Sequence, residues 1–105
     1  MNDSAIYLPG YKINLKAKDI LRLKGDGNYT HIYCKGDKTY LVCLTLKRLM
    51  ATLPEFIRTH KTAAVNPLHV KIYEPDLILK DGTEIPMSKR RRSIVKNLMN
   101  DYRTA

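Results

Sequence analysis

The chain has 105 residues and a mass of 12.1 kDa, which is the size of one ordinary domain and excludes a two-domain enzyme. A hydrophobic content of 44% excludes a disordered tail, and the short apolar stretches exclude a membrane span or a signal-peptide core. With 19 Lys and Arg against 10 acidic residues, the net charge of +9 favours a polyanionic partner, nucleic acid ahead of an anionic membrane. We therefore expect a soluble, cytoplasmic protein.

The first residues contain Pro9 and Gly10, and we expect residues 1–11 to be an N-terminal lead or linker remnant that precedes a domain over residues 12–105. Residues 13–15 are compatible with a first strand. Residues 20–24 alternate apolar with basic side chains, which predicts a strand with one face inward. Residues 25–28, Gly-Asp-Gly-Asn, then predict an exposed loop, and no helix start follows that would make it a phosphate-binding loop.

A hairpin is predicted over residues 29–34 and 39–43, with Gly36-Asp37 as a two-residue turn. This register pairs Tyr33 with Tyr40 and Ile32 with Leu41. It separates Cys34 from Cys43 by about 13 Å, too far for a disulfide. Two free thiols suit a cytoplasmic protein.

Between the two predicted hairpins, a short helix begins after Thr45, which can cap it, and stops near Pro54. The strand-like residues 56–58 and 63–65 flank a polar loop at residues 59–62. A turn at Asn66-Pro67 precedes a strand over residues 69–73.

A second hairpin over residues 77–80 and 83–86 has Asp81-Gly82 as a type I′ turn and pairs Ile78 with Ile85. A helix capped by Ser88 closes the chain; its apolar stripe consists of Ile94, Val95, Leu98, Met99 and Tyr102. Short, closely spaced strands with two peripheral helices predict a mainly antiparallel β domain.

Catalysis and metal binding find no support in the residue pattern. The serines lack a nucleophile context, and the acidic residues fall mostly in turns. The 2 Cys and 3 His have no zinc-ligand spacing. We therefore expect no enzyme activity, no metal and no cofactor.

Polar side chains gather in three loops. In residues 25–29 the amide of Asn28 suits adenine and the phenol of Tyr29 suits a phosphate, although an αL turn followed by a packed aromatic explains the same residues. Residues 58–62 supply two cations, two hydroxyls and an imidazole, which a solvated loop would also explain. The basic run at residues 89–92 opposes the macrodipole at a helix start, a placement that calls for an anion.

The order of these motifs resembles the LytTR family, the DNA-binding output domain of LytR, AlgR and AgrA type bacterial response regulators. The resemblance covers about residues 12–100 and is carried by an ordered series of short motifs. These are Asp-Ile-Leu-Arg-Leu at 19–23, Gly-Asn-Tyr-Thr at 27–30, Leu-Thr-Leu-Lys at 44–47, Leu-Pro at 53–54, Phe-Ile-Arg-Thr-His-Lys-Thr at 56–62, Val-Asn at 65–66, Leu-Lys-Asp-Gly at 79–82 and Ile-Pro-Met-Ser at 85–88.

The resemblance implies an elongated fold of about ten short strands in three antiparallel sheets, with a short helix and here also a C-terminal helix. It implies loops inserted into successive major grooves of a direct-repeat promoter site, with a second copy on the adjacent repeat. It also implies control by a receiver or sensor domain that is absent from this chain. The base contacts that it implies are Asn28, Lys61 and Arg90, and the backbone contacts expected around them are Tyr29, Arg58, His60, Thr62, Ser88, Lys89 and Arg91.

The sequence thus predicts sequence-specific double-stranded DNA binding by a bacterial transcriptional regulator of a two-component system. Two alternatives stay open. One is a sequence-independent RNA or single-strand binding β module, with Tyr33 and Tyr40 as a stacking platform. The other is a protein-interaction domain whose basic face docks an acidic partner.

Overall fold

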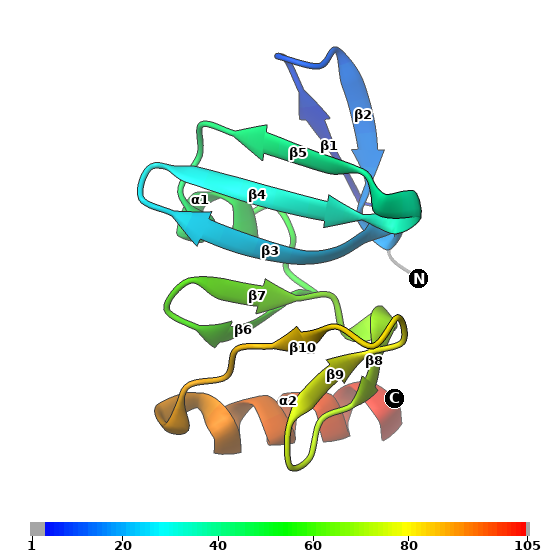
Figure 1. Cartoon of the computed structure of the whole chain (residues 1–105), viewed down its shortest axis with the longest axis vertical. Helices are drawn as coiled ribbons and strands as arrows, with labels where there is room; N and C mark the ends of the chain where they lie inside the picture. Colours follow the sequence, from blue (N-terminus) through cyan, green and yellow to red (C-terminus); the bar gives the residue numbers. More distant parts are fainter. Residues whose placement is uncertain (1–3, 105) are drawn as a thin grey trace.

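A computed structural model describes residues 4–104 and shows ten strands in three antiparallel sheets (Figure 1). The mainly β architecture and the C-terminal helix confirm the predicted fold class. A two-stranded sheet pairs β1 (Ala5–Leu8) with β2 (Ile13–Lys16). The five-stranded sheet has the order β5-β4-β3-β7-β6 and consists of β3 (Ile20–Asp26), β4 (Tyr29–Cys34), β5 (Thr39–Val42), β6 (Ile57–His60) and β7 (Ala63–Val65).

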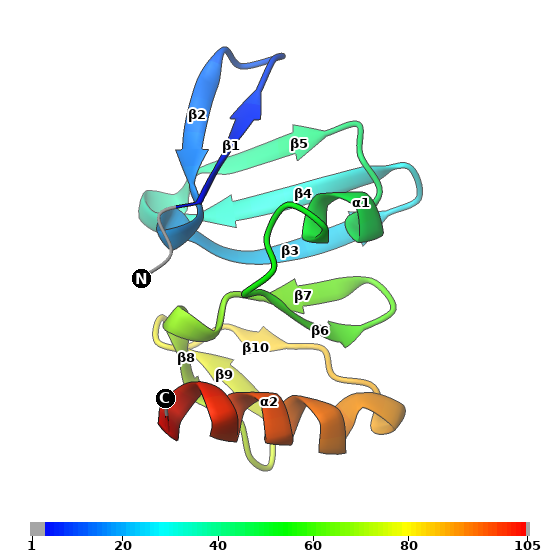
Figure 2. The same ribbon diagram turned by 180° about the vertical axis from the view of Figure 1, so that it is seen from behind.

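The third sheet has the order β10-β9-β8 and contains β8 (Val70–Ile72), β9 (Leu77–Leu79) and β10 (Glu84–Ile85). Helix α1 (Leu46–Met50) lies behind the five-stranded sheet in Figure 1 and in front of it in Figure 2, and α2 (Arg92–Thr104) lies at the far end of the molecule. Four 3₁₀ turns are η1 (Ala17–Asp19), η2 (Lys35–Asp37), η3 (Pro67–His69) and η4 (Lys89–Arg91). None of the described helices is long and apolar enough to cross a membrane.

Two hydrophobic clusters hold these layers together. The first joins α1 and the β1–β2 hairpin to the five-stranded sheet and includes Leu23, Ile32 and Leu49. The second joins β6 and β7 to the three-stranded sheet and α2, around Val65, Leu79 and Met99. Strand β7 is buried throughout because Ala64 belongs to the first cluster whereas Ala63 and Val65 belong to the second. The result is a 38 × 30 × 24 Å molecule.

Strand β1 was not predicted, because Pro9 and Gly10 indicated a junction. They lie instead between two paired strands, with Leu8 opposite Ile13. Ile6 and Leu8 are 7% and 2% exposed and belong to the first core cluster. Part of the stretch expected to be a lead therefore contributes to the core, while the first three residues of that stretch lie outside the described residues.

The predicted register of the β4–β5 hairpin was wrong by one residue. Ile32 pairs with Tyr40 and Tyr33 with Thr39, because η2 makes a three-residue connection closed by a hydrogen bond from Cys34 N to Lys38 O (2.8 Å). Since a one-residue shift exchanges the faces of a strand, Tyr33 and Tyr40 lie on opposite faces. The stacking platform of the single-strand alternative is therefore not formed.

The β9–β10 register was wrong for the same reason. Ile85 pairs with Leu77, and Leu79 N donates to Thr83 O (2.9 Å), so the connection again has three residues. Gly82 has a φ of +92° but Asp81 is not at positive φ, which excludes the predicted type I′ turn because that turn needs both.

Helix capping followed the prediction at one helix only. The Thr45 side chain accepts from Arg48 N (3.2 Å) at the start of α1, as predicted. The Ser88 side chain makes no capping hydrogen bond, since η4 intervenes before α2 and the Ser88 carbonyl accepts from Arg91 N instead. The two cysteines are free, as predicted, with Cys34 buried and Cys43 exposed.

Candidate nucleic-acid interface

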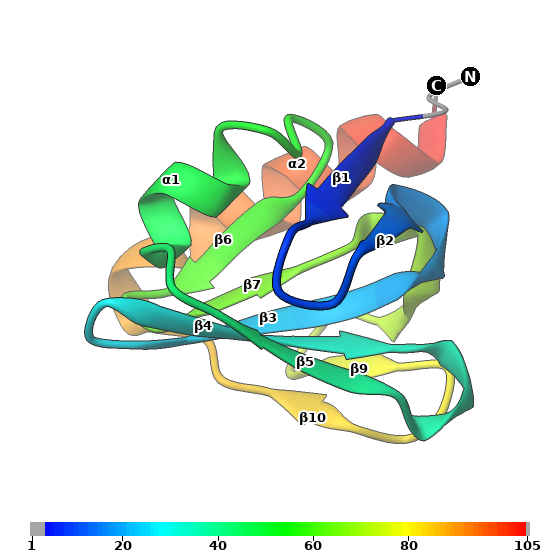
Figure 3. The same cartoon turned by 90° about the horizontal axis from the view of Figure 1, so that it is seen from above.

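Three connections come together along one edge of the molecule, on the left in Figure 1 and again on the left in Figure 3. They are the β3–β4 turn (Gly27-Asn28), the β6–β7 turn (Lys61-Thr62) and η4 (Lys89–Arg91). We call these three connections the turn edge. The three polar clusters found in the sequence thus converge, although 61 positions separate Asn28 from Lys89 in the chain.

The β3–β4 turn is shorter than the predicted four-residue loop, because β3 continues to Asp26, which pairs with Tyr29. Gly27 adopts a φ of +59°, a left-handed conformation that suits glycine and closes the strands tightly. Asn28 is exposed and Tyr29 is 48% exposed. The turn therefore presents an amide and a phenol to solvent.

The β6–β7 turn is braced by Arg58. Its Nε donates to His60 O (3.0 Å) and its Nη2 donates to Lys61 O. The Arg58 side chain, which was expected to reach DNA, therefore donates two hydrogen bonds within its own turn. Lys61, at the tip, is exposed.

His60 and Thr62 form a second contact within this turn. Thr62 N donates to His60 Nδ1 (3.2 Å), and Thr62 Oγ1 lies 3.1 Å from the same nitrogen. Because Nδ1 accepts, the imidazole proton belongs on Nε2 in this arrangement, leaving an N–H donor for an anion.

Thr59, which the sequence placed among the exposed donors of this loop, is buried. Its hydroxyl donates to Pro86 O (2.8 Å), and its carbonyl accepts from Ser88 N (2.9 Å). Both bonds tie β6 to the segment that leads into η4. The inward alternation of Ile57 and Thr59 in β6 was the signal that could have identified this scaffolding role.

The remaining link joins the first two turns, since Gly25 N donates to Thr62 O (2.9 Å). The charges are also close together: burial and, after it, the positive charge of Arg91 lower the pKa of the Arg58 guanidinium. Within residues 4–104, Lys61, Lys89 and Arg90 make no ion pair with an acidic group. The turn edge is therefore a connected unit with uncompensated positive charge.

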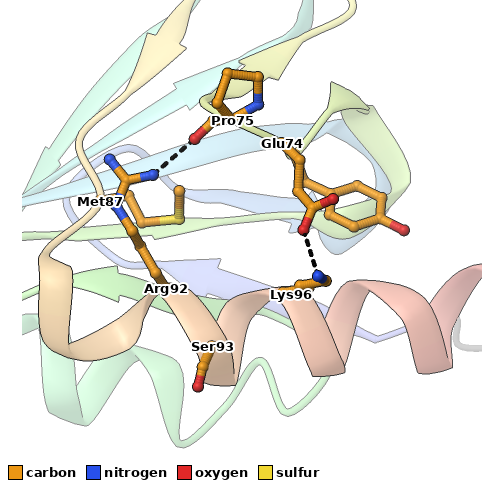
Figure 4. A pocket seen from close by; sticks show the side chains of 7 residues that line it. Glu74, Pro75, Met87, Arg92, Ser93 and Lys96 are labelled. Carbon is orange, nitrogen blue, oxygen red and sulfur yellow. Dashed lines mark hydrogen bonds and ion pairs between the residues drawn. The ribbon is translucent and has the colours of Figure 1, made fainter.

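The basic run at 89–92 divides in the structure. Lys89 and Arg90 are exposed on η4, whereas Arg92 donates from Nη1 to Pro75 O (2.7 Å) across a cavity of about 560 Å³ (Figure 4). Lys96 lines the same cavity and pairs with Glu74 at 2.9 Å. Both cations of this cavity have partners in the chain, so Arg92 does not share the environment of Lys89 and Arg90.

A module of short antiparallel strands that gathers amide, hydroxyl and cationic groups on hairpin turns has the features of a loop-based DNA-binding domain. Residues 11–100 match the family model of the LytTr DNA-binding domain. The chain belongs to this family, which confirms the resemblance found in the sequence. The family is one of DNA-binding domains and not a class of enzymes.

Two curated relatives are transcriptional or sensory regulators. The chain is 33% identical over 103 residues to the heme-containing CO-sensing transcriptional regulator RcoM 2 of Paraburkholderia xenovorans (strain LB400), covering 90% of this chain and 38% of that protein. It is 35% identical over 72 residues to the sensory transduction protein LytT of Bacillus subtilis (strain 168), covering 61% and 30%. The chain thus spans less than half the length of these relatives.

A solved structure supports the fold. The LytTr DNA-binding domain of a putative methyl-accepting/DNA response regulator from Bacillus cereus superposes with a TM-score of 0.75 at 20% identity, covering 93% of this chain and 98% of that one. Both chains therefore share the same overall fold.

Proposed function

We propose that this domain binds double-stranded promoter DNA sequence-specifically, for a bacterial transcriptional regulator, by placing the turn edge in successive major grooves. The observation that carries this proposal is the alignment of three hydrogen-bonded connections on one edge, two of which carry exposed cations. Family membership supports DNA as the polyanion.

The dimensions fit a duplex. Major grooves recur on one side of B-DNA about every 34 Å, and each is about 12 Å wide, which admits a two-stranded ribbon. The three connections follow one another along the longest axis of the domain, which measures 38 Å and is comparable to this groove spacing.

The residue roles follow from exposure. Asn28, Lys61 and Arg90 stand at exposed positions of the three connections and are proposed to contact bases. His60 and Thr62 are proposed to contact the phosphate backbone, as are Tyr29, Ser88, Lys89 and Arg91 around them. Arg58, also expected there, is proposed to contribute mainly by holding the β6–β7 turn.

The site is proposed to be a direct repeat, with a second copy of the domain on the adjacent repeat and a receiver or sensor domain in control. The regulatory character of the curated relatives supports this arrangement.

The experiment is selection of bound duplexes from a random library at near-physiological salt, followed by sequencing. We expect a short motif that recurs as a direct repeat. A bound pool that stays random, or equal affinity for single strands and RNA, would overturn the proposal.

A further inference from the structure

One face of the five-stranded sheet is uncovered on β3, β4 and β5. Helix α1 packs on the opposite face, and no ribbon crosses in front of these strands in Figure 1. The uncovered side carries Arg22 and Lys24 from β3, His31 and Tyr33 from β4, and Leu41 from β5, which we call the open face. Strand pairing sets Arg22 opposite Tyr33, Lys24 opposite His31, and His31 opposite Leu41.

Arg22 lies over the ring of Tyr33 on this face. Its Cζ lies 3.8 Å from the centroid of the Tyr33 ring. No hydrogen bond or ion pair of its guanidinium occurs within the described part of the chain. Arg22 contributes to lowering the pKa of Asp81, but mainly hydrogen bonds from Thr83 lower that pKa, and no ion pair joins Asp81 to Arg22. A guanidinium fixed on an aromatic ring with free donors is pre-organised for a planar anion.

The neighbours of Arg22 extend the surface. The rings of His31 and Tyr33 stack with centroids 6.3 Å apart, and His31 Nε2 lies 3.8 Å from the Asp26 carboxylate. Leu41 is 46% exposed beside His31. The open face thus offers a cation on a ring, a second ring and an apolar side chain in adjacent strands.

Distance separates Arg22 from DNA bound at the turn edge. Arg22 and Tyr33 lie four residues from the last strand pair, Asp26–Tyr29, which corresponds to about 14 Å at 3.4 Å per residue. A major groove is only about 8.5 Å deep. A duplex that receives the β3–β4 turn therefore stays short of Arg22, although Lys24 lies close enough for its phosphates.

We propose that the open face, centred on Arg22 and Tyr33, docks an extended acidic segment of a second protein while DNA occupies the turn edge. A carboxylate of that segment takes the free donors of Arg22, and an apolar side chain packs on Leu41. Charge complementarity supports this occupant, and only the simultaneous presence of DNA rests on the proposed function.

The test uses a fluorescein-labelled peptide of alternating Glu and Leu, with a Gln–Leu peptide as its neutral match. Anisotropy is measured with the protein alone and with the protein saturated by selected duplex. We expect R22Q to weaken the Glu–Leu peptide about tenfold, and Y33L to weaken it by a smaller factor. K71Q, which removes an exposed cation of β8, and Y33F, which keeps the ring, should bind the peptide like the wild type.

R22Q and Y33L should leave duplex affinity unchanged within about twofold. Circular dichroism is used to check that each variant is folded. Equal peptide binding by wild type, R22Q and K71Q would overturn the proposal, as would equal binding of the Gln–Leu peptide. Loss of duplex affinity in R22Q would reassign the face to DNA. If the wild type binds no duplex, the proposed function fails. The proposal of a docking surface is still decided, because peptide binding is also measured on the free protein.

Discussion

The basic run at residues 89–92 contains side chains in two different environments. Arg92 is anchored to the Pro75 carbonyl, whereas Lys89 and Arg90 are exposed without an ion pair among the described residues. The sequence could identify this run as a basic cluster but could not divide it, because the division depends on where η4 ends and α2 begins.

We expect R90A to relax specificity, with a loss of about 1–3 kcal/mol on the specific duplex and a smaller loss on random duplex. K89A should weaken all sequences alike and reduce the salt slope by about one. R92A is the matched control and should bind DNA nearly like the wild type. Fluorescence titrations at several salt concentrations measure all three, and equal losses on both duplexes for R90A and K89A would contradict this division.

Cys34 supplies a pH prediction. Burial, followed by the nearby Asp19 carboxylate, raises the pKa of the Cys34 thiol from its ordinary 9.0 to about 11, against a smaller opposing effect of Lys38. Above pH 9.0 the unfolded chain therefore loses this proton while the folded chain keeps it, so stability falls until the pH reaches about 11.

Because tyrosines and lysines also titrate in this range, the measurement is a comparison of variants. Urea unfolding between pH 8 and pH 11 or so should show a shallower loss of stability with C34A than with the wild type. C43A, which removes the exposed thiol, should keep the wild-type slope. Parallel slopes for all three proteins would show that Cys34 ionises equally in both states.

At the scale of elements, the strand positions after β1 followed largely from the residue pattern, but the strand registers did not. Both predicted two-residue turns were three-residue connections, with positive φ at Gly36 and Asp37 in the first and at Gly82 in the second. Turn length decides which residues pair, and the three-residue connection moved Tyr40 to the core side while Tyr33 stayed on the face opposite Ile32. Composition alone cannot distinguish a two-residue turn from a three-residue turn, because Gly and Asp are suited to either.

The β3–β4 turn depends on Gly27. G27A places a Cβ at a φ of +59°, which costs about 1–2 kcal/mol in an L-residue. We expect a correspondingly lower unfolding free energy and weaker DNA binding, because Asn28 is carried by this turn. G10A is the control: its added Cβ meets nothing within 4 Å, and Gly10 is not at positive φ. Urea denaturation compares the two, and equal effects would show that the left-handed position is not the cause.

Thr59 links two connections of the turn edge through its hydroxyl bond to Pro86 O. T59V keeps the shape but leaves that carbonyl without its donor, and should cost about 1–3 kcal/mol. DNA affinity should fall by a larger factor on specific than on random duplex, because η4 loses its support. T59S, which keeps the hydroxyl, should bind like the wild type. If T59V destabilises the fold but leaves specificity intact, the link does not position η4.

For the whole molecule, local patterns predicted strands and helices but not how three sheets stack. The three-sheet arrangement was predicted only from the resemblance of the ordered motifs to the LytTR family. Long-range contacts such as the hydrogen bond from Ser88 N to Thr59 O have no local signature in the sequence. The residues of the turn edge were found from the sequence itself, whereas their convergence on one surface was predicted only from the resemblance to the family. The open face was not foreseen, since Arg22 and Tyr33 lie in different strands and meet only through the β3–β4 register.

A rigid turn edge makes a prediction about spacing in the DNA. Hydrogen bonds from Gly25 N to Thr62 O and from Ser88 N to Thr59 O fix the three connections relative to one another. Inserting about five base pairs, half a helical turn, between the bases read by Asn28 and those read by Arg90 should reduce affinity to the non-specific level. Inserting a full turn of about ten should do the same, because a 38 Å domain cannot span the added 34 Å or so. A full turn inserted between two repeats preserves the helical face and should leave each copy bound.

Mobility-shift titrations of the insertion series measure these affinities. Recovery of affinity with a full turn inside one repeat would mean that Asn28 and Arg90 act from different copies of the chain, and the single-domain reading of the site would fail.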